Sequence, residues 1–142
     1  MKYLLLCLTL VLVNTLTAQE DFVPLQISAQ GKTIKASYNS TVSVDTLFLN
    51  INKNETGKLV IMNANVKAEN DIKRDYFISN EKDNQPLNLT FLSRVVGISN
   101  ISLKQISTQI VKGNIYNLYT TTTSIEDSNK KQKILLCKIV VR

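Results

Sequence analysis

The sequence contains no histidine and no tryptophan, and it has only two cysteines, two prolines and four glycines. The absence of histidine excludes Ser-His-Asp and Cys-His nucleophile systems, and it removes the side chain that most often binds metals in proteins. The low cysteine and glycine contents exclude a disulfide-dense miniprotein and a collagen-like chain. What is present is a chain of 142 residues, 44% apolar, with a formal net charge of +6. This is an ordinary composition for one globular domain.

The amino-terminal residues have the order of a secretory signal peptide. Lys2 precedes an apolar run from Leu4 to Val13, and small and polar residues follow from Thr15 to Gln19. The run is shorter than the ~20 residues that span a bilayer, which disfavours the alternative of a retained membrane anchor. We therefore expect residues 1–19 to be a cleaved signal peptide and residues 20–142 to form a single β-sandwich domain. We also expect no transmembrane segment after signal removal, and a protein that is exported to the periplasm or beyond the cell.

The two cysteines have different expected fates. Cys7 lies inside the apolar run and follows Leu6, whereas a lipid-acceptor cysteine closes such a run after a small residue. Signal removal would leave Cys137 alone, so no internal disulfide is expected. Because Cys137 alternates with Leu135 and Ile139, we expect it to be a small buried hydrophobe and not a reactive thiol.

The mature segment is dominated by β-branched residues that are separated by short polar clusters, a pattern typical of strands joined by turns. The ranges expected to be strands are 25–29, 33–38, 42–51, 58–66, 75–79, 87–91, 101–111, 115–123 and 134–141. Residues 95–98 extend the strand at 87–91 or begin another. In the last strand we expect an inner face formed by Leu135, Cys137, Ile139 and Val141, after a charged loop from Glu126 to Lys133.

The range 101–111 fits two structures. Ile101 and Leu103 alternate as in a strand, whereas Leu103, Ile106 and Ile110 have helical spacing. We favour a strand because both flanking segments resemble strands.

Seven to nine strands at short spacing, with no other helix signal, predict a single antiparallel β-sandwich of the immunoglobulin-like kind. The Cys…Trp…Cys pattern of antibody domains is absent. A small closed β-barrel is the alternative fold.

Carboxylates are the one remaining source of acid-base chemistry. Glu69, Asp71 and Asp75 surround one polar break, and Glu81 and Asp83 share a loop. Paired carboxylates in a glycosidase need a rigid cleft, and calcium loops need closely spaced oxygen ligands that are not mixed with lysines. Because lysines and arginine alternate with these residues, we interpret them as solvated turn charges. We assign no catalytic, cofactor-binding or metal-binding residue, and the binding residues are unknown at this stage.

The basic residues form one cluster, Lys130, Lys131 and Lys133. Nucleic-acid sites commonly place aromatic rings beside such lysines. No aromatic residue lies among them in the sequence, and Tyr116 and Tyr119 would lie on opposite faces of one strand. We therefore expect no nucleic-acid partner.

Two short segments resemble known families. Tyr76 to Asn80, a polar loop, and Pro86 to Leu89 are similar to a strand, loop and strand of periplasmic immunoglobulin-like modules. The stretch from Asp75 to Leu92 is similar to the small accessory chaperones of bacterial curli fibres, although the paired cysteines of some of these chaperones are missing. The second resemblance implies an exported sandwich that acts on a fibre subunit.

Together these features predict an exported, non-catalytic β-sandwich that binds an envelope or extracellular protein or polymer at the bacterial cell envelope. The composition, rich in Lys, Asn and Ile, is typical of an AT-rich bacterial genome. Pairing with an exposed edge strand is the simplest binding mode for this fold. An accessory chaperone for a surface fibre is one alternative, and a small secreted carboxylate-based enzyme or enzyme inhibitor is the other.

Expression of the full chain in a secreting bacterium tests the signal peptide. We expect the exported product to begin at Gln19 or Glu20, as measured by intact mass and amino-terminal sequencing. A product that keeps residues 1–19 in the membrane fraction would contradict this prediction.

Overall fold

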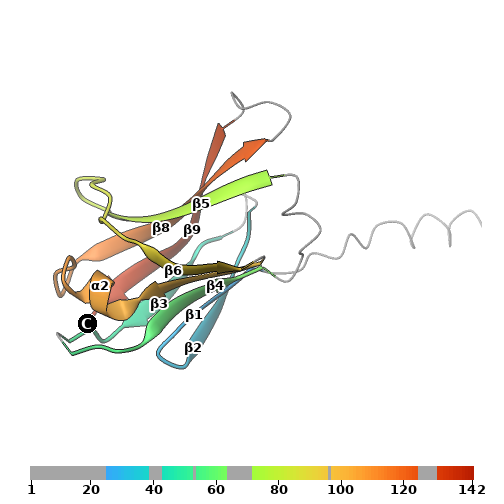
Figure 1. Cartoon of the computed structure of the whole chain (residues 1–142). Coiled ribbons are helices and arrows are strands. Elements are labelled where there is room, and N and C mark those ends of the chain that lie inside the picture. Colours follow the sequence, from blue (N-terminus) through green and yellow to red (C-terminus); the bar gives the residue numbers. More distant parts are fainter. Residues whose placement is uncertain (1–24, 39–42, 53, 64–71, 96, 125–130) are drawn as a thin grey trace, which may run out of the picture.

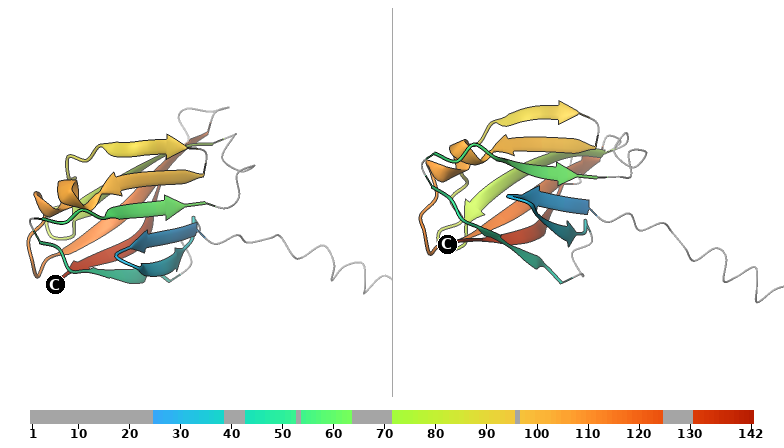
Figure 2. Two further views of the ribbon diagram at one scale, coloured as in Figure 1. Left: turned by 60° about the horizontal axis from the view of Figure 1, so that its bottom comes forward. Right: turned by 90° about the horizontal axis from the view of Figure 1, so that it is seen from below.

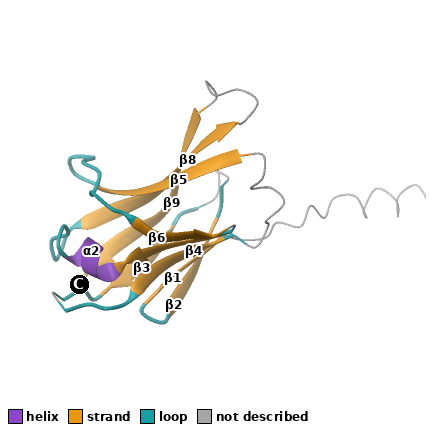
Figure 3. Ribbon diagram, in the orientation of Figure 1, coloured by secondary structure: helices purple, strands orange, loops and turns teal. Residues whose placement is uncertain are grey.

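The computed structural model describes residues 25–38, 43–52, 54–63, 72–95, 97–124 and 131–142. These residues form nine strands and one short helix, which follow in chain order: β1 (Leu25–Ala29), β2 (Lys32–Ala36), β3 (Asp45–Leu49), β4 (Lys58–Met62), β5 (Ile72–Asn80), β6 (Phe91–Val95), β7 (Ile98–Ser102), α2 (Leu103–Ser107), β8 (Ile115–Ser124) and β9 (Lys131–Val141). The all-β prediction is confirmed, and Figure 3 shows the described helix at one end of the molecule.

The strands form two stacked sheets (Figures 1 and 2). One sheet has five strands in the order β2-β1-β4-β7-β6, and the other has four strands in the order β3-β9-β8-β5. Neighbouring strands are antiparallel except β3, which runs parallel to β9. The structure is therefore a sandwich, and the closed-barrel alternative is wrong.

The strand order of the two sheets can be compared with that of an immunoglobulin-like domain. Without β2 and β3, the remaining strands correspond in sequence to strands A to G of such a domain. The sheets then contain β1-β4-β7-β6 and β9-β8-β5, which are the A-B-E-D and G-F-C orders of that fold. The strand β2 extends the first sheet beyond β1, and β3 extends the second beyond β9.

Tyr116 at the start of β8 makes a further contact typical of this fold. Its ring is 2% exposed, and its hydroxyl accepts a hydrogen bond of 2.8 Å from the backbone N–H of Val111, five residues upstream. Immunoglobulin-like domains have a tyrosine corner at this place, two residues before the second cysteine of their inter-sheet disulfide. Here that later position is Leu118, which is buried. At the position where antibody domains have a disulfide cysteine, this protein therefore has a buried leucine side chain.

The core lies between the two sheets and is built from alternate residues of each strand. Its largest fully buried side chains are Tyr116, Leu25, Ile27, Leu47, Leu49, Leu59, Ile61, Ile78, Ile101, Leu103, Ile106 and Leu118. Thr120 is also fully buried, and its hydroxyl donates to the carbonyl oxygen of Asp75 at 3.1 Å. In β4, Leu59 and Ile61 face this core, so the apolar alternation at Val60 and Met62 belongs to the outer face.

One correction concerns the inner face of the last strand. Leu118 pairs with Cys137, but the next residue, Tyr119, pairs with Leu135, so Leu136 is an extra residue in β9. This bulge shifts the alternation by one position. Ile134 and Leu136 are consequently buried with Cys137, whereas Leu135 is half-buried on the outer face. The prediction that Leu135 faces the core is wrong.

A second correction concerns residues 101–111. The strand β7 ends at Ser102, and residues Leu103–Ser107 form α2. The hydroxyl oxygen of Ser102 accepts a hydrogen bond from the N–H of Lys104, which caps the helix. Leu103 and Ile106 are buried and Ile110 packs against the core, so the helical spacing was the correct signal here.

The predicted strand at 87–91 is also wrong over most of its length. Only Phe91 belongs to β6. The backbone N–H groups of Asn88 and Thr90 donate to the side chains of Gln109 and Gln105, so side chains provide the partners that a neighbouring strand would otherwise provide. Leu87 and Leu89 still pack against the core.

Smaller differences occur at strand ends. The strand β9 begins at Lys131, so residues 131–133 are strand and not loop. The strand β5 is longer than predicted, and β3 is shorter. The predicted strand residues 42 and 64–66, the loop residues 126–130 and the expected signal peptide at 1–19 lie outside the described residues.

Substitution Tyr116→Phe tests the tyrosine corner. The change removes the acceptor of the Val111 N–H while keeping the buried ring, so we expect the free energy of unfolding to fall by about 1–2 kcal/mol. Urea denaturation measures this. Tyr119→Phe is the matched control, because Tyr119 lies half-buried on the outer face, and a change within about 0.5 kcal/mol is expected there. Equal losses in the two variants would contradict the assignment.

Candidate functional site

The outer face of the four-stranded sheet carries apolar side chains in places where a solvent-facing sheet normally has polar ones. One cross-strand row consists of Phe77 on β5, Tyr119 on β8 and Leu135 on β9. All three are half-buried. The rings of Phe77 and Tyr119 are stacked, with centroids 5.3 Å apart and an interplanar angle of 19°. We call this row the aromatic band.

Two further rows complete this surface. The next row contains Ser79, Asn117 and Lys138, and we call it the polar band. Beyond it, Ile115, Val140 and Phe48 form a second apolar band, in which β3 contributes Phe48. We call the whole surface the banded face.

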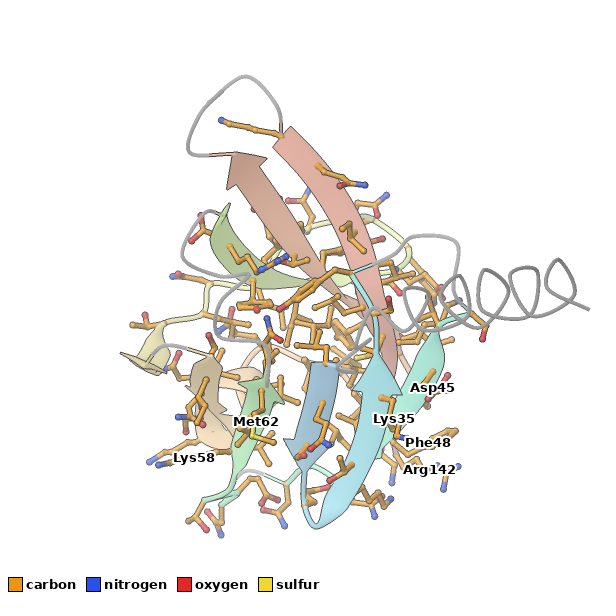
Figure 4. All side chains as sticks on the ribbon, turned by 90° about the vertical axis from the view of Figure 1, so that its right-hand side faces the viewer. Lys35, Asp45, Phe48, Lys58, Met62 and Arg142 are labelled. Atoms are coloured by element: carbon orange, nitrogen blue, oxygen red, sulfur yellow. The ribbon has the colours of Figure 1, made fainter. Side chains whose placement is uncertain are left out.

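The outer face of the five-stranded sheet is different. Its apolar residues stand among polar ones: Val60 pairs with Ser28 and Asn100, and Met62 pairs with Gln26 and Ile98. Among the side chains that the structure describes, this face therefore presents single apolar residues and one cross-strand pair, Met62 and Ile98, both of which are exposed. Figure 4 shows Lys58 and Met62 on β4, well separated from Phe48 and Arg142 at the edge of the other sheet.

Cations lie on the apolar side chains of the banded face. The Lys133 ammonium is 4.1 Å from the centroid of the Tyr119 ring and 5.2 Å from that of Phe77. The Arg142 guanidinium is 4.0 Å from the centroid of the Phe48 ring. Each contact is a cation–π interaction, which leaves the cation exposed to solvent and available to an anion. Both apolar bands therefore have a positive charge above them.

The polar band contains an ion pair and two buried acceptors. Lys138 Nζ is 2.7 Å from Oε1 of Glu81, and both side chains are partly exposed. Asn117 lies between Lys138 and Ser79 in the row, so the ion pair crosses over β8. In the same band, Ser79 Oγ and Asn117 Oδ1 are buried and have no hydrogen-bond partner in the described residues. A buried polar atom of this kind costs about 1–3 kcal/mol unless water or a ligand satisfies it.

The sheet edges carry features that hinder strand addition. The edge strand β2 is five residues long and has exposed Lys32 and Lys35, and the Lys32 ammonium donates to the carbonyl of Phe48 on the neighbouring edge. The strand β6 is interrupted by a register shift. The end of β5 is paired with the segment that follows it, because the N–H of Leu87 donates to the carbonyl of Ile78.

The structure separates the carboxylates that the sequence grouped. Glu69 and Asp71 lie outside the described residues, and Asp75 lies on β5. Glu81 pairs with Lys138, and Asp83 accepts from the N–H of Gln85 within the loop. Among the described residues, no group of three or more His, Cys, Asp or Glu side chains could hold a metal ion.

Cys137 lies at the inner face of β9 and is fully buried. Burial, together with the smaller effect of the Asp45 charge, raises the pKa of its thiol to about 12. The thiol is therefore protonated at neutral pH.

Sequence reasoning missed the banded face. The Lys131–Lys133 cluster and the aromatic residues Phe77 and Tyr119 lie on different strands, and only the cross-strand register brings them together. No aromatic residue lies among these lysines in the sequence, but in the structure the Lys133 ammonium lies over the rings of Tyr119 and Phe77. The one available signal was the apolar residues on both faces of the last two strands.

The chain matches no known family model, no curated protein and no solved structure. No helix within the described ranges is long and apolar enough to cross a membrane.

The reactivity of Cys137 tests its burial. In protein lacking residues 1–19, we expect an aromatic disulfide reagent to leave the folded protein unmodified at pH 8 and to label one thiol in urea, because a thiol with a pKa of about 12 has almost no thiolate at pH 8. Rapid labelling of the folded protein would contradict the buried assignment.

Proposed function

We propose that this protein is an exported, non-catalytic binding module of the bacterial cell envelope, and that it holds a protein partner on the banded face. The observation that carries the proposal is the pair of apolar bands on an exposed sheet face. Continuous apolar surface of this kind marks interaction sites in proteins. The amino-terminal pattern of Lys2 and the apolar run supports export.

The edges are less suited than the face to this role. Short strands, edge lysines and a register shift are features by which proteins prevent further strand pairing. The sequence suggested edge pairing because every open sheet has unpaired edges. The contacts of β2, β5 and β6 favour the face instead.

An accessory chaperone for a surface fibre is the second candidate. The stretch from Asp75 to Leu92, which resembles curli chaperones, contributes Phe77 and Ser79 to the banded face and Glu81 to its ion pair. A fibre subunit held on this face is consistent with that resemblance.

Site-specific photocross-linking in living cells tests the proposal without disturbing the fold. A photoreactive amino acid replaces Leu135 on the banded face or, as the matched control, Met62 on the outer face of the other sheet. We expect a discrete higher-mass adduct in the envelope fraction from position 135 and at least fivefold less from position 62.

Two results would contradict the proposal. One is the absence of any adduct at position 135 although the variant is exported and folded. The other is an equal or stronger adduct at position 62, which would move the binding surface to the five-stranded sheet.

A further inference from the structure

The bands of this face have the spacing of an extended chain. The strand β8 contributes one residue to each of the three bands, at alternate positions: Ile115, Asn117 and Tyr119. At a rise of 3.3–3.4 Å per residue, the two apolar bands lie roughly 13 Å apart, with the polar band midway between them. An extended segment laid along the strands repeats side chains on one face with the same period.

The charges of the face favour an anionic occupant. In the described residues, its cations are Lys131, Lys133, Lys138 and Arg142. They outnumber its carboxylates, Asp75 and Glu81. The whole chain has a formal net charge of +6. An acidic partner therefore gains both steering and contact energy here.

This inference rests on the proposed function. We infer that the partner presents an extended acidic polypeptide segment, in which residue i is apolar, residue i+2 is acidic and residue i+4 is apolar. The two apolar side chains lie on the aromatic band and on the second apolar band. The carboxylate lies over the polar band and pairs with Lys138. Lys133 and Arg142 attract further acidic residues at either end of the segment.

The same surface disfavours two other occupants. A second copy docked face to face would bring the same excess of cations from both protomers together, which costs free energy. An anionic polysaccharide would satisfy the cations, but Ile115, Leu135 and Val140 offer nothing to its hydroxyl groups. A polypeptide supplies both carboxylates and apolar side chains.

Glu81 occupies the place of the partner's carboxylate. It is bound to Lys138 at 2.7 Å, and Lys138 shares the polar band with Ser79 and Asn117. The partner's acidic residue therefore competes with Glu81 for Lys138. In the polar band, Ser79 Oγ and Asn117 Oδ1 are buried and have no hydrogen-bond partner in the described residues. The backbone N–H groups of a segment laid along this band are donors of the kind that these atoms lack.

Fluorescence anisotropy with a synthetic peptide tests the inference. The probe carries Val, Glu and Phe at alternate central positions between Ser and Thr. One control peptide has Lys in place of Glu, and another has the same composition with Val and Phe adjacent and Glu at one end. We expect the probe to bind at least tenfold more tightly than either control.

Variants give effects of opposite sign. Glu81→Gln removes the competing carboxylate, so we expect the dissociation constant of the probe to fall about threefold or more. Lys133→Gln removes an attracting cation, so we expect that constant to rise by about the same factor. Lys58→Gln, which removes an exposed lysine from the other sheet, is the matched control and leaves the affinity unchanged. Urea denaturation shows whether each variant is folded.

The inference would be overturned if the Lys peptide or the shuffled peptide bound as tightly as the probe, or if the affinity for the probe were unchanged in Glu81→Gln. It would also be overturned if dextran sulfate displaced the labelled probe while excess unlabelled probe did not. Cross-linking at position 135 without probe binding would reject this chemistry and leave the proposed function standing. Failure of the cross-link at position 135 would reject the proposed function itself.

Discussion

The pairing of β8 with β9, with Leu136 as an extra residue in β9, determines which side chains enter the core and which form the banded face. Strand side chains alternate with a period of two, so one inserted residue exchanges the faces on one side of the insertion. With Cys137 facing inward, an unbroken strand would also turn Leu135 and Lys133 inward. Because of the bulge, Ile134 and Leu136 are buried instead, and Leu135 and Lys133 reach the outer surface beside Tyr119.

Much of the fold could be predicted from local sequence. The range 25–29, the turn at Gly113 with its positive φ, and the strand at 115–123 follow from alternation and turn residues, which act over a few positions. The failures occur where distant groups decide the structure. Gln105 and Gln109 bond the backbone of residues 88–90, and no pattern within that segment indicates those partners. The short helix after Ser102 had a visible 3–4 residue spacing, but the strands around it outweighed that signal.

The candidate site was harder to predict than the fold, because it depends on register between strands that are far apart in sequence. Phe77 and Tyr119 are 42 positions apart in the chain and directly opposite in the sheet. Lys138 and Glu81 are 57 positions apart and form an ion pair. Sequence can place Phe77 and Tyr119 on strands, but no local pattern gives the register of β5 against β8. The alignment of Leu135 with Tyr119 depends in addition on the bulge at Leu136. Interpreting Glu81 as solvated loop charge was reasonable from its neighbours, and its ion pair could not be foreseen.

An exposed apolar face is a hazard as well as a binding surface, since it also favours self-association. The charges on this face oppose that outcome. Lys133 and Arg142 lie on the aromatic rings, so copies approaching face to face meet like charges before apolar contact is made. Glu81 pairs with Lys138 and neutralises one of the cations of this face. In the proposed complex, a partner with carboxylates at the matching spacing replaces Glu81 and cancels the repulsion at the same time. The charges that oppose face-to-face contact between copies are therefore the charges by which, in this proposal, the face selects an acidic partner.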